Sequence, residues 1–130
     1  MAESARSVLD ASALLALFNI ETGASIVAGY AVSSAISSVN WCEAFGKLLS
    51  AGVNGAEVRA RMSRTRIAVI PFDRSDAEAA GELLVPTRAH GLSLADRACL
   101  ALAARLGVPA VTADRAWIDL DVGVEIVSIR

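Results

Sequence analysis

The stretch SVLDASALLALFNI, residues 7–20, decides the fold. Residues 7–10 are typical of the end of a short strand, and the apolar pattern that follows predicts a helix over residues 13–20, closed by Thr22-Gly23. A strand that runs directly into a helix is how α/β domains begin. Asp10 therefore stands at the carboxyl end of a strand, where open α/β sheets bind their ligands.

The rest of the chain continues this alternation. Strands are predicted over residues 32–38, 67–72, 108–112 and 125–129, and helices over residues 38–50, 54–65, 73–84, 87–90 and 94–105. The sequence thus predicts one α/β domain over residues 1–130, with a mainly parallel central sheet and helices on both faces.

Composition and charge narrow the functional classes. Apolar residues make up 55% of the chain, yet no run approaches the roughly 18 residues of a membrane span, and we expect no export signal at the N-terminus. We therefore expect a cytoplasmic protein without a membrane partner. A net charge of −2 means that any nucleic acid must be bound locally. Cys42 and Cys99 lack metal-ligand spacing, and we expect both to be reduced core thiols.

Three further acids could join Asp10. Asp114 follows the strand over residues 108–112, and Asp96 lies in the first turn of the helix over residues 94–105. Glu43 is less direct, because a helical wheel places it opposite an apolar stripe of Cys42, Phe45 and Leu49, so it reaches the others only if its face lines a cleft.

Electrostatics decides what such a cluster would need. Two carboxylates about 5 Å apart repel by roughly 3 kcal/mol at an effective dielectric near 20, so a cluster of ionised acids requires a cation. Oxygen ligands alone suit Mg²⁺ or Mn²⁺ better than zinc. The chemistry natural to this site is phosphodiester hydrolysis.

Each acid also has a local structural interpretation, which the sequence leaves open. Asp10 could cap the helix after it, Asp96 could complete a capping box with Ser93, and Asp114 could cap a turn at residues 115–117. Glu43 could form an i,i+4 ion pair with Lys47, the single lysine of the chain.

Four segments together resemble a known family, the PIN-domain ribonuclease toxins of the VapC type. They are Ser7–Ala16 (SVLDASALLA), Ser38–Glu43 (SVNWCE), Gly91–Ala103 (GLSLADRACLALA) and Val111–Trp117 (VTADRAW), in the family's order and nearly end to end. The resemblance implies a PIN fold, endoribonuclease activity dependent on Mg²⁺ or Mn²⁺, and membership of a toxin–antitoxin pair.

The resemblance also implies roles for individual residues. Asp10, Glu43, Asp96 and Asp114 match the family's acidic quartet, as catalytic residues and metal ligands. Ser12 and Thr112 match polar residues that line such sites, and Asp119 is the nearest candidate for a further acid found in some members. The implied partners are an RNA substrate, with transfer or ribosomal RNA both plausible, a cognate antitoxin and a second copy of the chain.

Basic and aromatic residues give weaker indications. Arg97 and Arg115 each follow a site acid and could position phosphate, and Arg59, Arg61, Arg64 and Arg66 could bind RNA or an acidic partner, or form a solvated helix end. We expect His90 at a helix C-terminus, and Trp41 and Trp117 in packing positions. Helices over residues 13–20 and 54–65 are our expectation for the antitoxin groove.

Competing classes lack a required residue. A phosphoacceptor domain needs a lysine at a late strand end, whereas Lys47 is on a helix, and a dehalogenase-like phosphatase needs an acid where Ser12 stands. The remaining alternative is a catalytically inactive PIN-like module that only binds an antitoxin or RNA.

Overall fold

The computed structural model describes residues 4–19 and 21–130 and contains a five-stranded sheet. The strands lie in the order β3-β2-β1-β4-β5, and every pairing is parallel. Their bounds are β1 (Ser7–Leu9), β2 (Ser34–Ser37), β3 (Ala68–Ile70), β4 (Ala110–Thr112) and β5 (Ile126–Ser128). The predicted α/β class and parallel sheet are confirmed, because parallel strands need helical crossovers of the kind the sequence pattern supplies.

Helices connect the strands. They are α1 (Ala11–Asn19), α2 (Ala24–Ala31), α3 (Ser38–Ser50), α4 (Gly55–Ser63), α5 (Arg74–Glu82) and α6 (Leu94–Leu106), with short 3-10 helices η2 (Arg88–His90) and η3 (Arg115–Asp119). Every predicted helix is present. The first begins at Ala11, directly after Asp10, instead of at residue 13, and the predicted end at residue 20 lies outside the described residues.

Helix α2 was not predicted. Its sequence, ASIVAGYA, is apolar nearly all round and includes a glycine, so it shows no helical periodicity. Only Val27 and Ala31, one turn apart, are buried in it. The helix is held by its packing on α1 and β2 more than by its own pattern.

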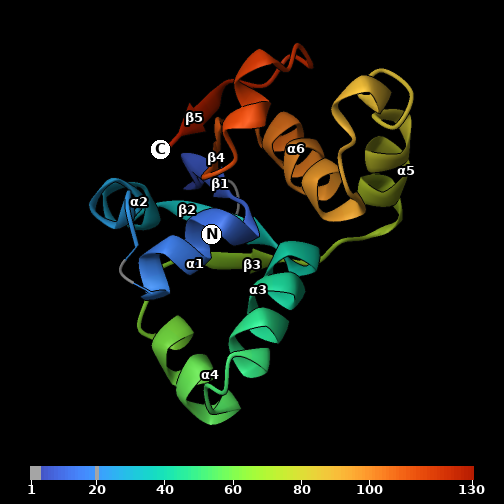
Figure 1. Cartoon of the computed structure of the whole chain (residues 1–130). Helices are drawn as coiled ribbons and strands as arrows, with labels where there is room; N and C mark the ends of the chain where they lie inside the picture. Colours follow the sequence, from blue (N-terminus) through green and yellow to red (C-terminus); the bar gives the residue numbers. More distant parts are fainter. Residues whose placement is uncertain (1–3, 20) are drawn as a thin grey trace.

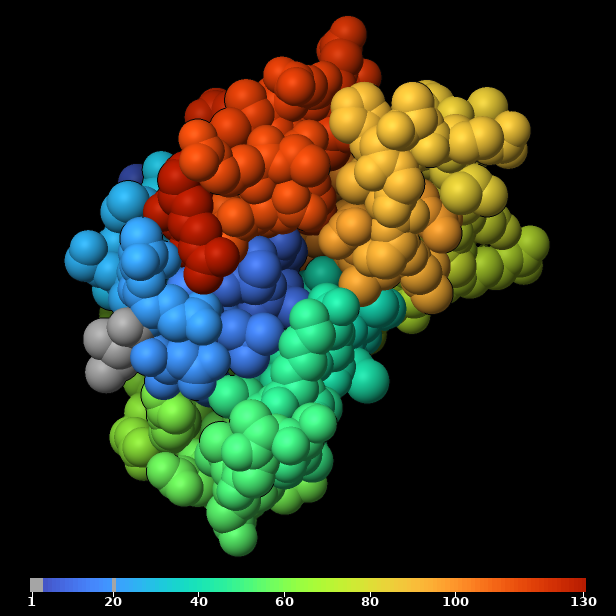
Figure 2. All heavy atoms as spheres, in the orientation of Figure 1, coloured from blue at the N-terminus to red at the C-terminus, as the bar shows by residue number. Residues whose placement is uncertain are grey.

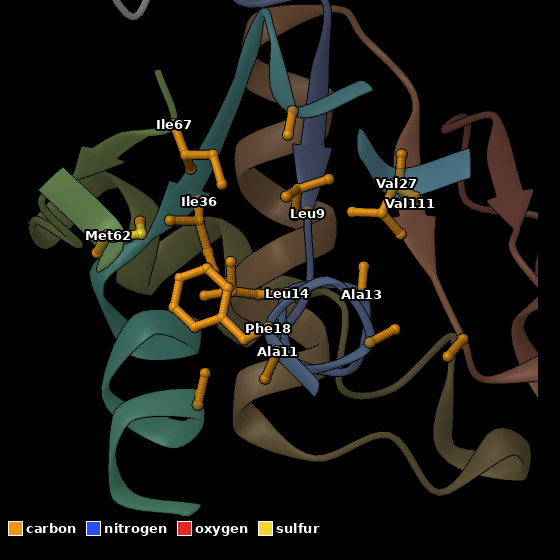
Figure 3. Close-up of a cluster of buried hydrophobic side chains, with 14 of the residues drawn as sticks. Leu9, Ala11, Ala13, Leu14, Phe18, Val27, Ile36, Met62, Ile67 and Val111 are labelled. Atoms are coloured by element: carbon orange, nitrogen blue, oxygen red, sulfur yellow. The ribbon is translucent and has the colours of Figure 1, made fainter. Parts of the chain in front are cut away.

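The sheet is covered on both faces, as predicted. Successive strand residues point to opposite sides: Leu9, Ile36 and Val111 pack with α1 to α4, whereas Val8, Ala35 and Ala110 pack with α6 and η3. Figure 1 shows α5 and α6 lying together, away from α1, α2 and α4. Figure 3 shows Leu14 and Phe18 of α1 meeting the side chains of the first core.

Two polar links join α5 to α6. Arg105, in the last turn of α6, forms an ion pair with the buried Asp76, at 2.9 Å between Nε and Oδ1. Arg97, near the start of α6, donates from Nη1 to the carbonyl oxygen of Ala80 at 2.9 Å. Asp76 also completes a capping box with Asp73.

The two cysteines differ. Cys99 is buried in α6, as predicted, but Cys42 is exposed, so the expectation of a second core thiol is wrong. The reason is the orientation of α3, whose buried line is Asn40, Ala44 and Leu48. Of the helices in the described part of the chain, none is by itself long and apolar enough to cross a membrane; α1 and α2 reach that length only together, across a sharp bend.

Candidate active site

The carboxylate of Asp10 is the centre of a buried polar cluster. Asp10 follows β1 directly and is only 5% exposed. Three donors converge on it: Ser12 Oγ at 2.7 Å and the backbone N–H of Ala13 at 2.8 Å on Oδ1, and Thr112 Oγ1 at 2.6 Å on Oδ2. The predicted helix-capping role of Asp10 is therefore confirmed, since Ala13 belongs to the first turn of α1.

The two hydroxyls bridge the ends of neighbouring strands. Ser12 Oγ accepts from the backbone N–H of Ala113, and Thr112 Oγ1 accepts from that of Asp114, both at 2.9 Å. Each hydroxyl thus accepts a hydrogen bond from a backbone N–H at the end of β4 and donates a hydrogen bond to Asp10. This network fixes the orientation of the carboxylate without neutralising it.

Burial dominates the electrostatics of Asp10. Desolvation raises the pKa of Asp10 above its ordinary value, although the hydrogen bonds from Thr112, Ser12 and Ala13 act in the opposite direction. The negative charge of Asp96 raises the pKa of Asp10 further, which places Asp96 within electrostatic range. Among residues 4–19 and 21–130, no Lys, Arg or His forms an ion pair with Asp10.

Asp96 and Asp114 both make the local caps that their sequence positions allow. Asp96 Oδ2 accepts from the backbone N–H of Ser93 at 2.9 Å, closing a capping box, and Asp114 Oδ1 accepts from that of Ala116 at 2.9 Å. Each cap uses one carboxylate oxygen. The second oxygen of each remains available to a ligand.

Glu43 makes the predicted ion pair with Lys47, at 3.8 Å between Oε2 and Nζ. The predicted orientation of α3 is wrong for Cys42 and Leu49, which are exposed, although Phe45 of the same stripe packs partly buried against the core. The buried face is that of Asn40, which lies one turn from Glu43. Glu43 therefore borders the packed side of α3, with 37% of its side chain exposed. This orientation favours a role in the site more than the helical wheel did.

The elements that carry the acids meet on one face of the molecule. Figure 2 shows the start of α1 in blue, the first half of α3 in teal and the start of α6 in orange side by side, and the contacts of α3 with α1 and with α6 agree. In the described ranges, however, no three acidic, cysteine or histidine side chains are close enough together to hold a metal ion. Each of the four acids has a local partner, which is Lys47 for Glu43 and a backbone N–H for Asp10, Asp96 and Asp114.

The secondary candidates lie in different surroundings. The guanidinium of Arg97 is directed at α5 and bonded to Ala80, whereas Arg115 and Asp119 are exposed on η3. Trp117 is fully buried and Trp41 packs on Phe45 with ring centroids 5.4 Å apart, so both are packing residues as expected. His90 ends η2 and is exposed.

Cys99 and Asn40 lie behind the acids, in the interior of the protein, and the sequence did not predict either as part of the site. Cys99 lies deep in the core, and burial, then the charges of Asp10 and Asp96, raises the pKa of its thiol, so the thiol stays neutral. Asn40 is 1% exposed and donates from Nδ2 to the carbonyl oxygen of Ala95 at 3.0 Å. The available signal was the spacing of Asn40, three residues before Glu43.

Comparisons with known proteins identify the family and the fold. The family model described as PIN domain matches residues 7–123. No curated protein sequence matches significantly.

Several solved structures share the fold. A toxin–antitoxin complex from Klebsiella pneumoniae has a TM-score of 0.73 at 22% identity, with 95% of this chain and 98% of that chain covered. DNA-bound VapBC from Salmonella typhimurium gives 0.74 at 20% identity, covering 97% and 99%. VapC20 of Mycobacterium tuberculosis, a toxin that cleaves the sarcin–ricin loop, gives 0.72 at 22%, covering 92% and 98%.

Proposed function

Because this chain belongs to the PIN-domain family, we propose that it is a metal-dependent endoribonuclease and the toxin of a VapC-type toxin–antitoxin pair. The catalytic residues and metal ligands are Asp10, Glu43, Asp96 and Asp114. The fold that it shares with VapBC proteins supports the proposal, as does the presence of all four acids on elements that meet at one face.

The observation that carries the proposal is the environment of Asp10. A buried carboxylate that accepts three hydrogen bonds but has no cationic partner among the described residues is costly to the fold. Such strain is characteristic of functional sites. A divalent cation beside Asp10 would compensate the buried charge.

The donor set fits a hard cation. The polar groups around Asp10 are carboxylate and hydroxyl oxygens. Neither Cys99, whose thiol is neutral, nor His90, which is not in a metal-binding group within the described residues, offers a zinc-like ligand. Mg²⁺ or Mn²⁺ bound there would supply positive charge to the scissile phosphate and acidify water.

The chain's own residues divide the remaining work. Asp10 provides the fixed carboxylate, and Ser12 and Thr112 hold its orientation by donating one hydrogen bond to each oxygen. Asp96 and Asp114 keep one oxygen for ligation while the other maintains the local cap. Glu43 would exchange its ion pair with Lys47 for the cation, and loss of that pair costs little because it is partly exposed.

RNA is the proposed substrate. The whole chain is acidic, so the phosphate backbone must be held by local positive charge, and Arg115 is exposed directly beside Asp114. Arg97 contributes less, since its guanidinium bonds to Ala80. A structural neighbour cleaves the sarcin–ricin loop, and we propose that structured ribosomal or transfer RNA is the substrate class here.

The proposed antitoxin site is an apolar groove of about 510 Å³ beside α1, α2 and the end of α4. It is lined by Leu17, Ala28, Ala31, Val32, Arg64, Thr65 and Arg66. Arg59 and Arg61 stack on Phe45 and Phe18. Arg64 and Arg66 are exposed and are the two arginines of the cluster that line the groove. An amphipathic acidic segment fits this groove.

A homodimer and a cytoplasmic location complete the proposal. Exposed apolar side chains at Leu84, Val85 and Leu94, beside the start of α6, provide a surface that a second copy could cover. Light scattering of the purified chain measures the oligomeric state.

The second candidate function is an inactive PIN-like binding module. The local partners of Glu43, Asp96 and Asp114 favour it, because they satisfy each acid without a cation. Anomalous scattering from Mn²⁺ soaked into crystals distinguishes the two: the nuclease binds the ion beside Asp10, and the binding module leaves the carboxylates without it.

RNA cleavage tests the nuclease directly. The purified chain should cut structured RNA with Mg²⁺ and not with a chelator, and Asp10→Ala and Asp96→Asn should abolish cutting with the fold intact. Asp76→Asn is the matched control for Asp96→Asn, because both acids are the third residues of capping boxes. Undiminished cleavage by both site variants would overturn the proposed site.

A further inference from the structure

Asn40 is a buried amide between two of the helices that carry the acids. It lies three residues before Glu43, and positions three apart share one face of a helix. Its Nδ2 donates at 3.0 Å to the carbonyl oxygen of Ala95, the residue directly before Asp96. In the part of the chain that the structure describes, this is the one hydrogen bond from a side chain of α3 to α6.

We propose that Asn40 is a positioning residue, whose amide fixes the separation of Glu43 and Asp96 so that both can bind one divalent cation. The inference rests on the proposed function. It assigns Asn40 no contact with substrate, and its effect passes through the two carboxylates.

The surroundings of Asn40 suit this role. The start of α3 is held to the sheet, because Ser37 caps it and Ser38 Oγ accepts from the backbone N–H of Phe72 at 3.0 Å. The start of α6 is held by its own capping box. Neither of these two contacts joins α3 to α6, whereas the Asn40 bond does.

Stability alone does not account for an amide here. Asn40 is 1% exposed, and its Oδ1 is buried without a hydrogen-bond partner among the described residues. Buried acceptors are nearly always paired, and an apolar side chain of similar shape leaves no acceptor unpaired. The Oδ1 atom is therefore available to a hydrogen-bond donor at the site, such as an ordered water between α3 and α6.

A fixed separation matters because of the ligand geometry of small cations. Mg²⁺ requires near-ideal octahedral distances, so carboxylates held in place bind it with less reorganisation than carboxylates on mobile helices. Residues behind metal ligands typically change metal affinity when they are replaced.

Mn²⁺ binding, measured by calorimetry on the full chain, tests the inference together with the melting temperature. Asn40→Leu keeps the branched shape of the side chain and removes both polar atoms, and we expect it to weaken Mn²⁺ binding by about tenfold or more. Asn40→Ala is the second variant if Asn40→Leu does not fold. The matched control is Asp76→Asn, which weakens the link between α5 and α6 at the end of α6 far from Asp96 and should lower the melting temperature without changing Mn²⁺ affinity.

The outcomes separate the two proposals. If the wild-type chain binds Mn²⁺ and the folded Asn40 variants bind it equally well, the positioning role is wrong and the metal site stands. If affinity falls equally in Asp76→Asn, the effect belongs to general stability and the role is also wrong. If neither the wild-type chain nor any variant binds Mn²⁺, the proposed metal site itself fails.

Discussion

Thr112 Oγ1 donates a 2.6 Å hydrogen bond to Asp10 Oδ2, joining residues 102 positions apart at the ends of adjacent parallel strands. The same hydroxyl accepts from the backbone N–H of Asp114. One side chain thus orients two of the proposed metal ligands. This relationship leads to the first prediction.

Thr112→Val should reduce RNA cleavage roughly 10–100-fold with a modest loss of stability, because valine keeps the shape of threonine but cannot donate to Asp10. Initial rates at several Mn²⁺ concentrations measure it. Ser128→Ala is the control. The backbone of Ser128 pairs with Thr112 in the sheet, but its hydroxyl forms hydrogen bonds only with the backbone of Arg130. Equal rates for the two variants would contradict the role of Thr112.

Asp10→Asn should make the metal-free protein more stable at neutral pH. Burial raises the pKa of folded Asp10 above its unfolded value of 3.8. Protonated Asp10 therefore stabilises the folded chain below pH 3.8, and this contribution to the free energy of unfolding is lost as the pH rises through the folded pKa. The melting temperature of the variant minus that of wild type should therefore grow between about pH 4 and pH 7. Saturating Mg²⁺ should raise the melting temperature of wild type and not of the variant. A difference independent of pH would contradict this account.

Glu43→Gln should lower cleavage by about 10–100-fold while leaving stability nearly unchanged, since its ion pair with Lys47 is partly exposed and worth less than about 1 kcal/mol. Lys47→Met should raise Mn²⁺ affinity slightly, because it removes a cation that competes for Glu43. Glu78→Gln, in the i,i+4 pair with Arg74 on α5, is the matched control and should cleave RNA normally. If Glu43→Gln is as active as Glu78→Gln, Glu43 is only a surface residue.

Gly23→Ala should destabilise the chain by about 1–3 kcal/mol. Gly23 has φ of 91°, and a Cβ there would lie 2.6 Å from the carbonyl oxygen of Ile129, so both the backbone and the packing of α2 oppose a side chain. Gly46→Ala, on the open side of α3, should instead stabilise by about 0.5–1 kcal/mol. Chemical denaturation of both variants measures the change in the free energy of unfolding. A change of the same sign in both variants would refute this prediction.

Val32→Asp should weaken binding of the cognate antitoxin while RNA cleavage by the free toxin is retained. Val32 is 64% exposed and lines the groove, where an added carboxylate would repel an acidic segment. Ile118→Asp is the control for antitoxin binding only. It adds the same charge at an exposed apolar residue of η3 outside the groove, so it should bind the antitoxin normally. Co-purification of the toxin variants with the antitoxin measures the effect; unchanged binding by Val32→Asp would place the antitoxin elsewhere.

Local patterns predicted the elements well where they carried periodicity or caps. Helix α3 has the predicted bounds, and α6 begins with the predicted capping box of Ser93 and Asp96. Helix α2 was missed, because ASIVAGYA has apolar residues on every side and no cap residue before it. Its helical form depends on contacts with α1 and β2, which no local pattern encodes.

The candidate site could also be predicted only where a local pattern fixes the place of a residue. Asp10 and Asp114 could be placed because both follow strands, and parallel strands end at one edge of a sheet. The helical wheel of residues 38–50 predicted that the side with Cys42 and Leu49 is buried, whereas the structure buries Asn40, Ala44 and Leu48. Hydrophobicity alone chose the wrong side, because α3 packs closely on α1 and α6 through smaller and polar side chains.

The sequence by itself determined where strands and helices alternate and which acids stand at their ends, since caps, periodicity and strand length are local properties of the chain. Only the tertiary structure decided that Ser12 and Thr112 converge on Asp10, that Asp10 is buried without a cation, and that Asn40 joins α3 to α6. These contacts join residues as many as 102 positions apart. Pairing and packing of the whole sheet fix such distances, and no segment specifies them alone.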